Sequence, residues 1–162
     1  MPSSEIQVKI GKPFRKLVAE EWLRQIVAQS LARKGINTPV ELGLVLADAG
    51  VVRRLNKKYL GKNEDTDVLS FALHEAAPEA SDTLFVTPPD GVLHLGEIVV
   101  SYPQAVAQAE EHHHSVEQEL ALLVVHGVLH ILGYDDEAGT AEREMRAEEQ
   151  KILEELNRNG II

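Results

Sequence analysis

Two histidines four residues apart, followed by a glycine and two aspartates, are the residues of this chain best suited to chemistry. They stand in the stretch HGVLHILGYDD, which runs from His126 to Asp136. On an α-helix, residues four apart lie on one face, so His126 and His130 can direct their imidazole nitrogens at one ion. Gly133 can take the left-handed backbone that ends a helix, which would bring Asp135 or Asp136 back toward that ion. On spacing we favour Asp136, and we interpret His126, His130 and Asp136 as the ligands of one zinc ion.

This spacing is close to the zinc-protease pattern H-E-x-x-H-x-x-G-x-x-H, from which it departs at two positions. Where those enzymes carry a general-base glutamate, this chain has Gly127, which has no side chain to move a proton. A conventional peptidase mechanism is therefore disfavoured. The third position holds Asp136 in place of histidine, and an aspartate oxygen is still a competent zinc ligand.

Two other interpretations of the same residues stay open. Apolar residues flank the pair on both sides, so His126 and His130 could be core histidines whose nitrogens are satisfied by hydrogen bonds. Asp135 could bind the metal while Asp136 caps the following segment.

Size and composition favour one domain. A chain of 162 residues, 44% of them hydrophobic, has enough apolar material for a sizeable core, and we expect a single domain over residues 1–162. It has no cysteine, so a metal must be held by His, Asp or Glu. No apolar run approaches the length of a membrane span and no leader segment is evident, so we expect a soluble, cytoplasmic protein.

The net charge of −10 conceals an asymmetry along the chain. Basic residues dominate positions 1–62 and acidic residues dominate positions 63–162. The basic side chains crowd together over positions 53–62, as Arg53, Arg54, Lys57, Lys58 and Lys62. An RNA backbone would meet the protein there, and we take Arg53, Arg54, Lys57 and Lys58 as candidate substrate-binding residues. The alternative is an ordinary solvated helix face.

Hydrophobic periodicity predicts strands and helices in alternation. Strands are expected at 6–10, 40–47, 66–73 and 93–101, and helices at 18–32, 48–59, 103–111, 115–132 and 138–156. Asp48 and the pair Ser115 with Gln118 are expected to cap their helices, and the glutamates of the last helix are expected to face solvent. Strand 40–47, its following helix and strand 66–73 would form a β-α-β unit with parallel strands. The fold class is α/β (α+β): one compact domain with a small mixed sheet packed with helices and the metal-binding helix in a cleft.

Four blocks in order resemble the YbeY endoribonuclease family. They are Leu55-Asn56 through Tyr59, TDVLSF from Thr66, LGEI from Leu95, and VHGVLHILGYD from Val125. The resemblance covers nearly the whole chain. It implies a bacterial, zinc-dependent single-strand endoribonuclease that acts in ribosomal RNA maturation and small-subunit quality control, with one metal ion at the floor of a cleft. Its implied partners are single-stranded or ribosomal RNA and components of the small ribosomal subunit.

The chain departs from the family pattern at two positions. The family's three ligands are histidines; His126 and His130 carry over, and the third falls on Asp136. With one carboxylate in place of an imidazole, the zinc site has a formal charge near +1 and not +2. The zinc-bound water should therefore be less acidic. The family often has an arginine after the tyrosine, proposed to act on the phosphate, and this chain has Leu60. Lys62 or Arg54 could supply that cation, as a point charge in the case of lysine.

The mechanism expected from these residues is metal-assisted hydrolysis of an RNA phosphodiester. We take His114, Asp67 and Lys62 as candidate catalytic residues, with Glu97 and Asp135 as further candidates for proton transfer. His112, His113 and His114 are expected to be a surface cluster at a helix end and not a second metal site, because consecutive residues on a helix point in different directions.

Two other functions remain as alternatives. One is a metallopeptidase or other zinc hydrolase, and the other is a non-catalytic ribosome assembly factor whose metal is structural.

Overall fold

The structure, a computed structural model, describes residues 5–36, 38–73, 91–134 and 139–162. These residues form four strands, a short 3-10 helix and five α-helices. In chain order they are β1 (Glu5–Ile10), η1 (Lys12–Phe14), α1 (Glu20–Arg33), β2 (Val40–Ala47), α2 (Ala49–Leu60), β3 (Val68–Ala72), β4 (Leu93–Ser101), α3 (Tyr102–Glu111), α4 (Val116–Ile131) and α5 (Thr140–Arg158).

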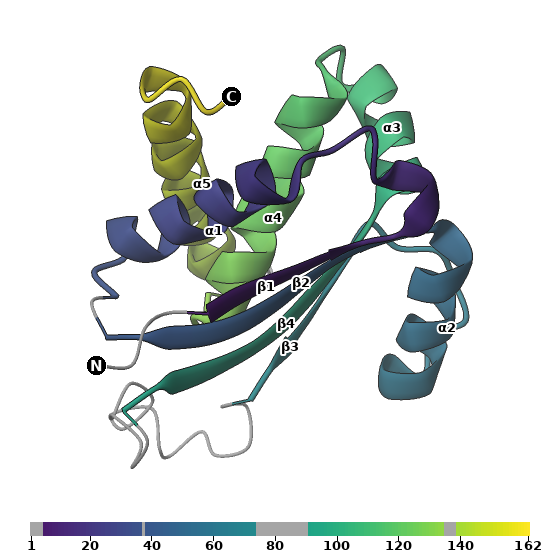
Figure 1. Cartoon of the computed structure of the whole chain (residues 1–162), viewed down its shortest axis with the longest axis horizontal. Helices are drawn as coiled ribbons and strands as arrows, with labels where there is room; N and C mark the ends of the chain where they lie inside the picture. The colour runs from purple at the N-terminus through teal and green to yellow at the C-terminus, as the bar shows by residue number, and fades with distance from the viewer. Residues whose placement is uncertain (1–4, 37, 74–90, 135–138) are drawn as a thin grey trace.

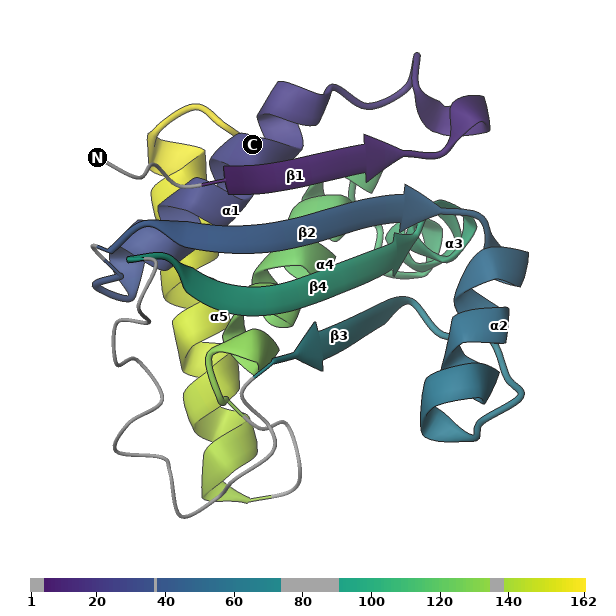
Figure 2. The same cartoon turned by 60° about the horizontal axis from the view of Figure 1, so that its bottom comes forward.

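The four strands form one mixed sheet in the order β1-β2-β4-β3. Strand β2 lies between two parallel neighbours, so Leu44 is in register with Val8 on one side and Ile98 on the other. Strand β3 is the edge strand and runs antiparallel to β4. Figure 2 shows this reversal: β2 ends, and β3 begins, at the end of the sheet beside α2.

Helices cover the two faces of the sheet unequally. Figure 1 shows α1, α4 and α5 on one side and α2 on the other. Side chains alternate along a strand, and Leu42, Leu44 and Leu46 of β2, each 1% exposed, belong to the main core under the first group of helices. A smaller cluster on the opposite face packs α2 against the sheet and contains Ala47, Val52, Leu69 and Val99.

The predicted parallel β-α-β unit is wrong. Strand β3 does not pair with β2, and its direction is opposite to that of β2 and β4. A crossover helix must carry the chain back along the sheet, whereas α2 stays at the end where β2 finishes (Figure 2). The chain therefore enters β3 from that same end and runs back along the free edge of β4.

The predicted element types are confirmed in the described residues, and so are the predicted caps. Strands 40–47 and 93–101 have the predicted bounds. Asp48 accepts a hydrogen bond from the Val51 amide at 2.8 Å, and Ser115 with Gln118 forms a reciprocal capping box at the start of α4. None of the helices in the described ranges combines the length and apolar character needed to span a membrane.

Candidate metal centre and active site

Helix α4 carries the two histidines and presents them to a pocket. The Nε2 atoms of His126 and His130 lie 3.1 Å apart, and the ring centroids are separated by 4.6 Å. Two nitrogens that bind one tetrahedral zinc ion at its usual distances lie roughly 3.3 Å apart. The two imidazoles therefore converge at a separation that fits a shared metal ion and that equally fits a hydrogen bond between the two rings.

The chain reverses directly after α4, as predicted. Gly133 has a φ of 101°, a backbone conformation that favours glycine, and its amide donates to the His130 carbonyl at 3.0 Å. The Tyr134 amide donates to the Leu129 carbonyl at 3.0 Å, which closes the turn. Asp135 and Asp136 lie outside the described residues, so the identity of the third ligand stays a prediction.

A glutamate on α5 holds the first histidine. Glu149 Oε1 lies 2.5 Å from His126 Nδ1, and the residue is only 8% exposed. A carboxylate on one ring nitrogen orients the imidazole and leaves the other nitrogen, here Nε2, to face a metal ion. This is the arrangement of a metal-ligating histidine with its supporting carboxylate.

The expectation that the glutamates of the last helix face solvent is wrong for Glu149. The sequence did carry a signal, because Glu149 falls on the same helical stripe as Met145, Ile152 and Leu156, all of which are buried. A glutamate within an apolar stripe needs a polar partner in the interior, and His126 is that partner.

Two adjoining pockets surround the histidines. The first has a volume of about 290 Å³ and is lined by His126, His130, Leu60 and the segment from Thr66 to Ala72. The second, of about 270 Å³, is lined by His126 and Glu149 together with His112 and Glu119 at its other end. His126 and Asp67 line both, so the two pockets meet beside the candidate metal centre.

Asp67, at the start of β3, is fixed beside the metal centre by its own hydrogen bonds. Oδ1 accepts from the Val68 amide at 2.8 Å, and Oδ2 accepts from Gln108 Nε2 at 3.2 Å. The Ser70 hydroxyl, which the sequence patterns did not single out, donates to the Gly127 carbonyl at 3.3 Å and ties the edge strand to α4. The TDVLSF block thus forms one wall of the first pocket.

Gly127 has a packing role that explains the missing glutamate. A Cβ atom at this position would lie 2.7 Å from Cγ2 of Ile98, a fully buried side chain of β4. Helix α4 therefore approaches the sheet so closely that a larger residue here would force Ile98 to shift. The general base of a zinc protease has no space at this position.

Comparison with known proteins identifies the family. The family profile described as Endoribonuclease YbeY matches residues 5–157. The chain belongs to the YbeY family. Among curated relatives, Endoribonuclease YbeY of Dehalococcoides mccartyi is 43% identical over 155 residues, which cover 94% of this chain and 90% of the relative. The corresponding protein of Roseiflexus castenholzii is 44% identical over 149 residues, covering 91% of this chain and 90% of that protein.

A solved structure shows the same architecture as this YbeY chain. The solution structure of TM1509 from Thermotoga maritima superposes with a TM-score of 0.60 at 27% identity. The match covers 93% of this chain and 88% of that one. The family resemblance predicted from the four sequence blocks, and the mixed sheet with helices, are therefore confirmed.

The candidate proton-transfer residues of this YbeY chain lie in different places. Asp67 lies beside the histidine pair. His114 contacts Glu119 near the start of α4 and lines neither of the two pockets. Glu97 is exposed and packs against Gly43 on the sheet face opposite α4. Lys62 is exposed and lines neither pocket, whereas Leu60, where the resemblance implies an arginine, lines the first pocket and is 55% exposed.

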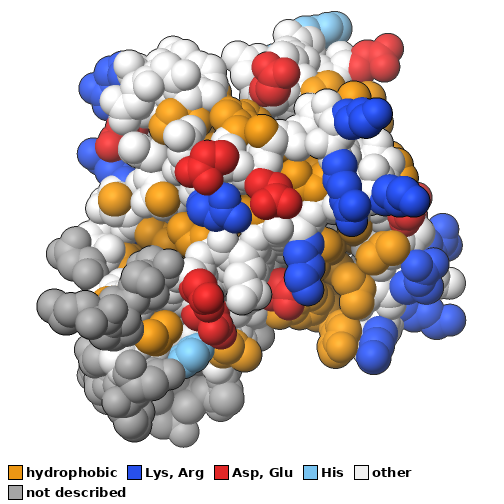
Figure 3. All heavy atoms as spheres, in the orientation of Figure 1, with side chains coloured by type: hydrophobic (Ala, Val, Ile, Leu, Met, Phe, Trp, Pro, Cys, Tyr) orange, Lys and Arg blue, Asp and Glu red, His pale blue; other side chains and the backbone are white. Residues whose placement is uncertain are grey.

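The four candidate substrate-binding residues lie together on α2 and outside the two pockets. Figure 3 shows Lys and Arg side chains gathered over this edge of the molecule. Arg53 donates to the Asn63 side chain at 3.1 Å and lies 3.8 Å from Asp65, so it also braces the segment after the helix. Arg54, Lys57 and Lys58 are exposed.

The three consecutive histidines lie at the end of α3, as predicted, but the prediction that they point in different directions is wrong for His112 and His114. His112 and His114 both contact Glu119, and their ligand atoms form a group that could hold a metal ion. The argument from helix geometry fails because α3 ends at Glu111, so these residues do not continue a helix.

Proposed function

We propose that this protein is a metal-dependent endoribonuclease that hydrolyses single-stranded RNA at the His126–His130 centre. The observation that carries the proposal is the convergence of the two Nε2 atoms, 3.1 Å apart, on an open pocket that Asp67 also lines. Family membership supplies the reaction class, because the matched relatives are named endoribonucleases.

The residues that would hold the metal are His126, His130 and, as the third ligand, Asp136. Glu149 supports His126 through Nδ1, so one imidazole is already oriented by the fold. The absence of cysteine and the His and carboxylate donor set favour zinc. A zinc-type ion in such a site supplies Lewis acidity toward a phosphate oxygen or a water molecule.

The proton-transfer role falls best to Asp67. Its carboxylate accepts one hydrogen bond at each oxygen and keeps further lone pairs, so it can orient a water molecule and take up a proton at Oδ2. Gln108 holds that oxygen in place from α3. His114 is too closely engaged with Glu119 to be the first choice.

The RNA strand would cross the exposed face of α2 before it reaches the pocket. Arg54, Lys57 and Lys58 provide positive charge there, and Tyr59, 57% exposed, offers an aromatic face for a base. Leu60 at the pocket's edge supplies no charge for the phosphate. We infer that this chain places less positive charge at the scissile bond than relatives with arginine there.

The finer assignment rests on the resemblance. We infer that the RNA is ribosomal, that the reaction belongs to its maturation and to quality control of the small subunit, and that it takes place in the bacterial cytoplasm. Depletion of the protein should then cause precursors of ribosomal RNA to accumulate, and restoration with a His126→Asn variant should leave them unprocessed.

One alternative keeps a specific observation in its favour. Leu60 in place of arginine suits a ribosome assembly factor with a structural metal. The first pocket, of about 290 Å³, favours a catalytic site, because a structural zinc site is closed by protein ligands and needs no space for a substrate. A peptidase is disfavoured because Ile98 fills the space beside Gly127 that a general-base glutamate would need.

The decisive experiment measures metal content and RNA cleavage on the same samples. We expect His126→Asn and His130→Asn to lose RNA cleavage together with the ion bound at this centre, and Glu149→Gln to weaken the affinity of this centre for metal by about 10-fold. His113→Asn is the matched control, because His113 is an exposed histidine with a φ of 57° that asparagine also tolerates.

The third ligand is tested by two further variants. Asp136→His should keep or strengthen metal binding, and Asp136→Ala should weaken it. Equal affinity of both variants and the unmodified protein would show that another residue is the third ligand. Cleavage that survives complete removal of metal by a chelator would contradict the proposed function.

A further inference from the structure

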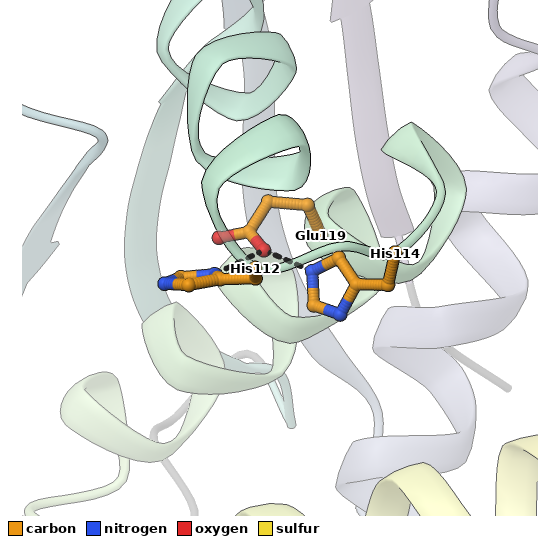
Figure 4. Close-up of side chains that lie close together, drawn as sticks. All are labelled: His112, His114 and Glu119. Carbon is orange, nitrogen blue, oxygen red and sulfur yellow. Dashed lines mark hydrogen bonds and ion pairs between the residues drawn. The ribbon is translucent and has the colours of Figure 1, made fainter.

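A second group of possible metal ligands lies at the end of the second pocket that is farther from His126. Glu119, on the first turn of α4, is 1% exposed. The same atom, its Oε2, contacts His112 Nδ1 at 3.1 Å and also His114 Nε2 (Figure 4). The three ligand atoms all lie within 4.8 Å of one another.

The backbone between α3 and α4 explains why the two imidazoles converge. His112 is the C-cap residue of α3, and His113 takes a left-handed conformation with a φ of 57°. This reversal places the residues on either side of His113 over the start of α4. The two rings lie 5.5 Å apart at 77°, and His113 itself is exposed.

We propose that His112, His114 and Glu119 bind a second divalent transition-metal ion, in a site separate from the His126–His130 centre. Two imidazole nitrogens and a carboxylate oxygen are the donors that zinc, cobalt and nickel prefer. His112 is half exposed, so the site is open to solvent on one side for a further ligand.

The burial of the Glu119 carboxylate favours binding of a cation at this site. An ionised carboxylate with almost no exposure is costly unless positive charge or hydrogen bonds compensate it. Within the described residues, the only ion pairs of Glu119 are with the two histidines, and no lysine or arginine approaches it. A metal ion held by all three groups neutralises the carboxylate and uses both imidazoles in their neutral form.

The second site is too far from the first to form a two-metal catalytic centre. Glu119 and His126 lie on the same stripe of α4, two helical turns apart, which is about 10 Å along the axis. Two-metal hydrolases hold their ions roughly 4 Å apart. The ion bound here therefore ties the α3–α4 turn to α4. It also stabilises the end of the second pocket that His112 and Glu119 line.

The test counts ions and measures affinity for Zn²⁺ and Co²⁺ on the full-length protein. We expect two ions per chain with dissociation constants in the micromolar range or tighter. His112→Asn should remove one ion and leave the other, and His114→Asn should do the same. His113→Asn is the matched control from the same turn and should keep both ions.

A second readout separates this site from the first. In a His126→Asn variant, where only the second site remains, Co²⁺ should raise the melting temperature by several degrees, and adding His112→Asn should abolish that rise. If His112→Asn and His114→Asn leave the ion count and the affinities unchanged, the second site does not exist, whatever the outcome at His126. Loss of an ion in His112→Asn but not in His126→Asn would instead contradict the first site alone.

Discussion

At the scale of single residues, the candidate active site depends on polar groups that lie in apolar surroundings. Glu149 and Glu119 are both buried on helices that otherwise present aliphatic residues to the core, and each contacts histidine. Buried carboxylates are stable only with such partners. Each histidine contact therefore orients a ring and satisfies a carboxylate at the same time.

Leu60 is the residue at which a single change should raise activity. It lines the pocket beside His126 and His130, and its exposed side chain can be replaced by a longer one without disturbing the core. We expect Leu60→Arg to increase kcat/KM for cleavage of single-stranded RNA by about 10-fold or more, because a guanidinium can stabilise charge on the phosphate.

Two other substitutions at position 60 separate charge from shape. Leu60→Lys should raise kcat/KM by less than Leu60→Arg does. Leu60→Met should not raise kcat/KM, since methionine is a long side chain without charge. An equal gain for arginine and methionine would show that the effect is not electrostatic.

Gly127 tests how tightly α4 packs on the sheet. A methyl group there would lie 2.7 Å from Cγ2 of the fully buried Ile98. We expect Gly127→Ala to lower the free energy of unfolding by about 1–3 kcal/mol, measured by urea denaturation, although alanine is the better helix former. Gly50→Ala in α2 is the matched control: its nearest neighbours lie at 3.4 and 3.6 Å, and it should stabilise the protein slightly.

At the scale of elements, an ion pair between the end of α1 and α5 supports the turn that follows the histidine-bearing helix α4. Lys34 Nζ lies 2.9 Å from Glu148 Oε2 and 4.9 Å from the centre of the Tyr134 ring. The hydrogen bond from Lys34 lowers the pKa of Glu148 below its usual 4.5. Burial, the largest influence, acts to lower the pKa of Lys34, but Tyr134 and Glu148 together outweigh it and raise that pKa above 10.5.

These two shifts define the pH range over which the pair stabilises the fold. The contribution of Glu148 is present above pH 4.5 and is lost as the pH falls through its lowered folded-state pKa. The contribution of Lys34 is present below pH 10.5 and is lost as the pH rises through its raised folded-state pKa. The pair therefore contributes fully at neutral pH.

We expect Lys34→Met to lower the free energy of unfolding by about 1 kcal/mol at neutral pH, since both side chains of the pair are half-buried. The difference from the unmodified protein should shrink at strongly acidic pH. Arg33→Met is the control, because Arg33 pairs with Glu155 across the same two helices but is more exposed, and its loss should cost less than about 1 kcal/mol. Denaturation curves across pH for both variants measure this.

At the scale of the whole molecule, the protein combines a net charge of −10 with a local basic surface on α2. Figure 3 shows the basic side chains on that side of the molecule. An acidic chain repels RNA in general, so productive binding must use the local surface. The position of α2 beside the first pocket, through Leu60, links this surface to the histidine centre.

The salt dependence of RNA binding tests this arrangement. When a protein gives up one phosphate interaction with a single strand, the slope of log affinity against log salt becomes shallower by about 0.7. We expect Lys57→Gln with Lys58→Gln to reduce the slope by about 1.4. Lys9→Gln with Arg158→Gln changes the net charge equally but lies on β1 and α5, and it should leave the slope unchanged. Equal effects of the two pairs would show that only total charge matters.

Helix and strand positions follow from local rules, which is why they could be predicted. The strands over 40–47 and 93–101 and the caps at Asp48 and Ser115 depend on side chains within a few residues of one another. The direction of β3 could not be predicted in this way. It depends on where α2 delivers the chain relative to the edge of β4, and no local pattern encodes that.

The sequence by itself determined the family, the types of its elements and the histidine pair, because motif order and helical periodicity are properties of the chain. Only the tertiary structure decided which distant groups meet these residues: Glu149 from α5 on His126, Ile98 from β4 against Gly127, and the two histidines of the α3–α4 turn on Glu119. The physical reason is that a buried polar atom requires a hydrogen-bond or ion-pair partner, but the sequence around that atom does not identify the residue that provides it. Packing of the helices on the sheet makes that choice.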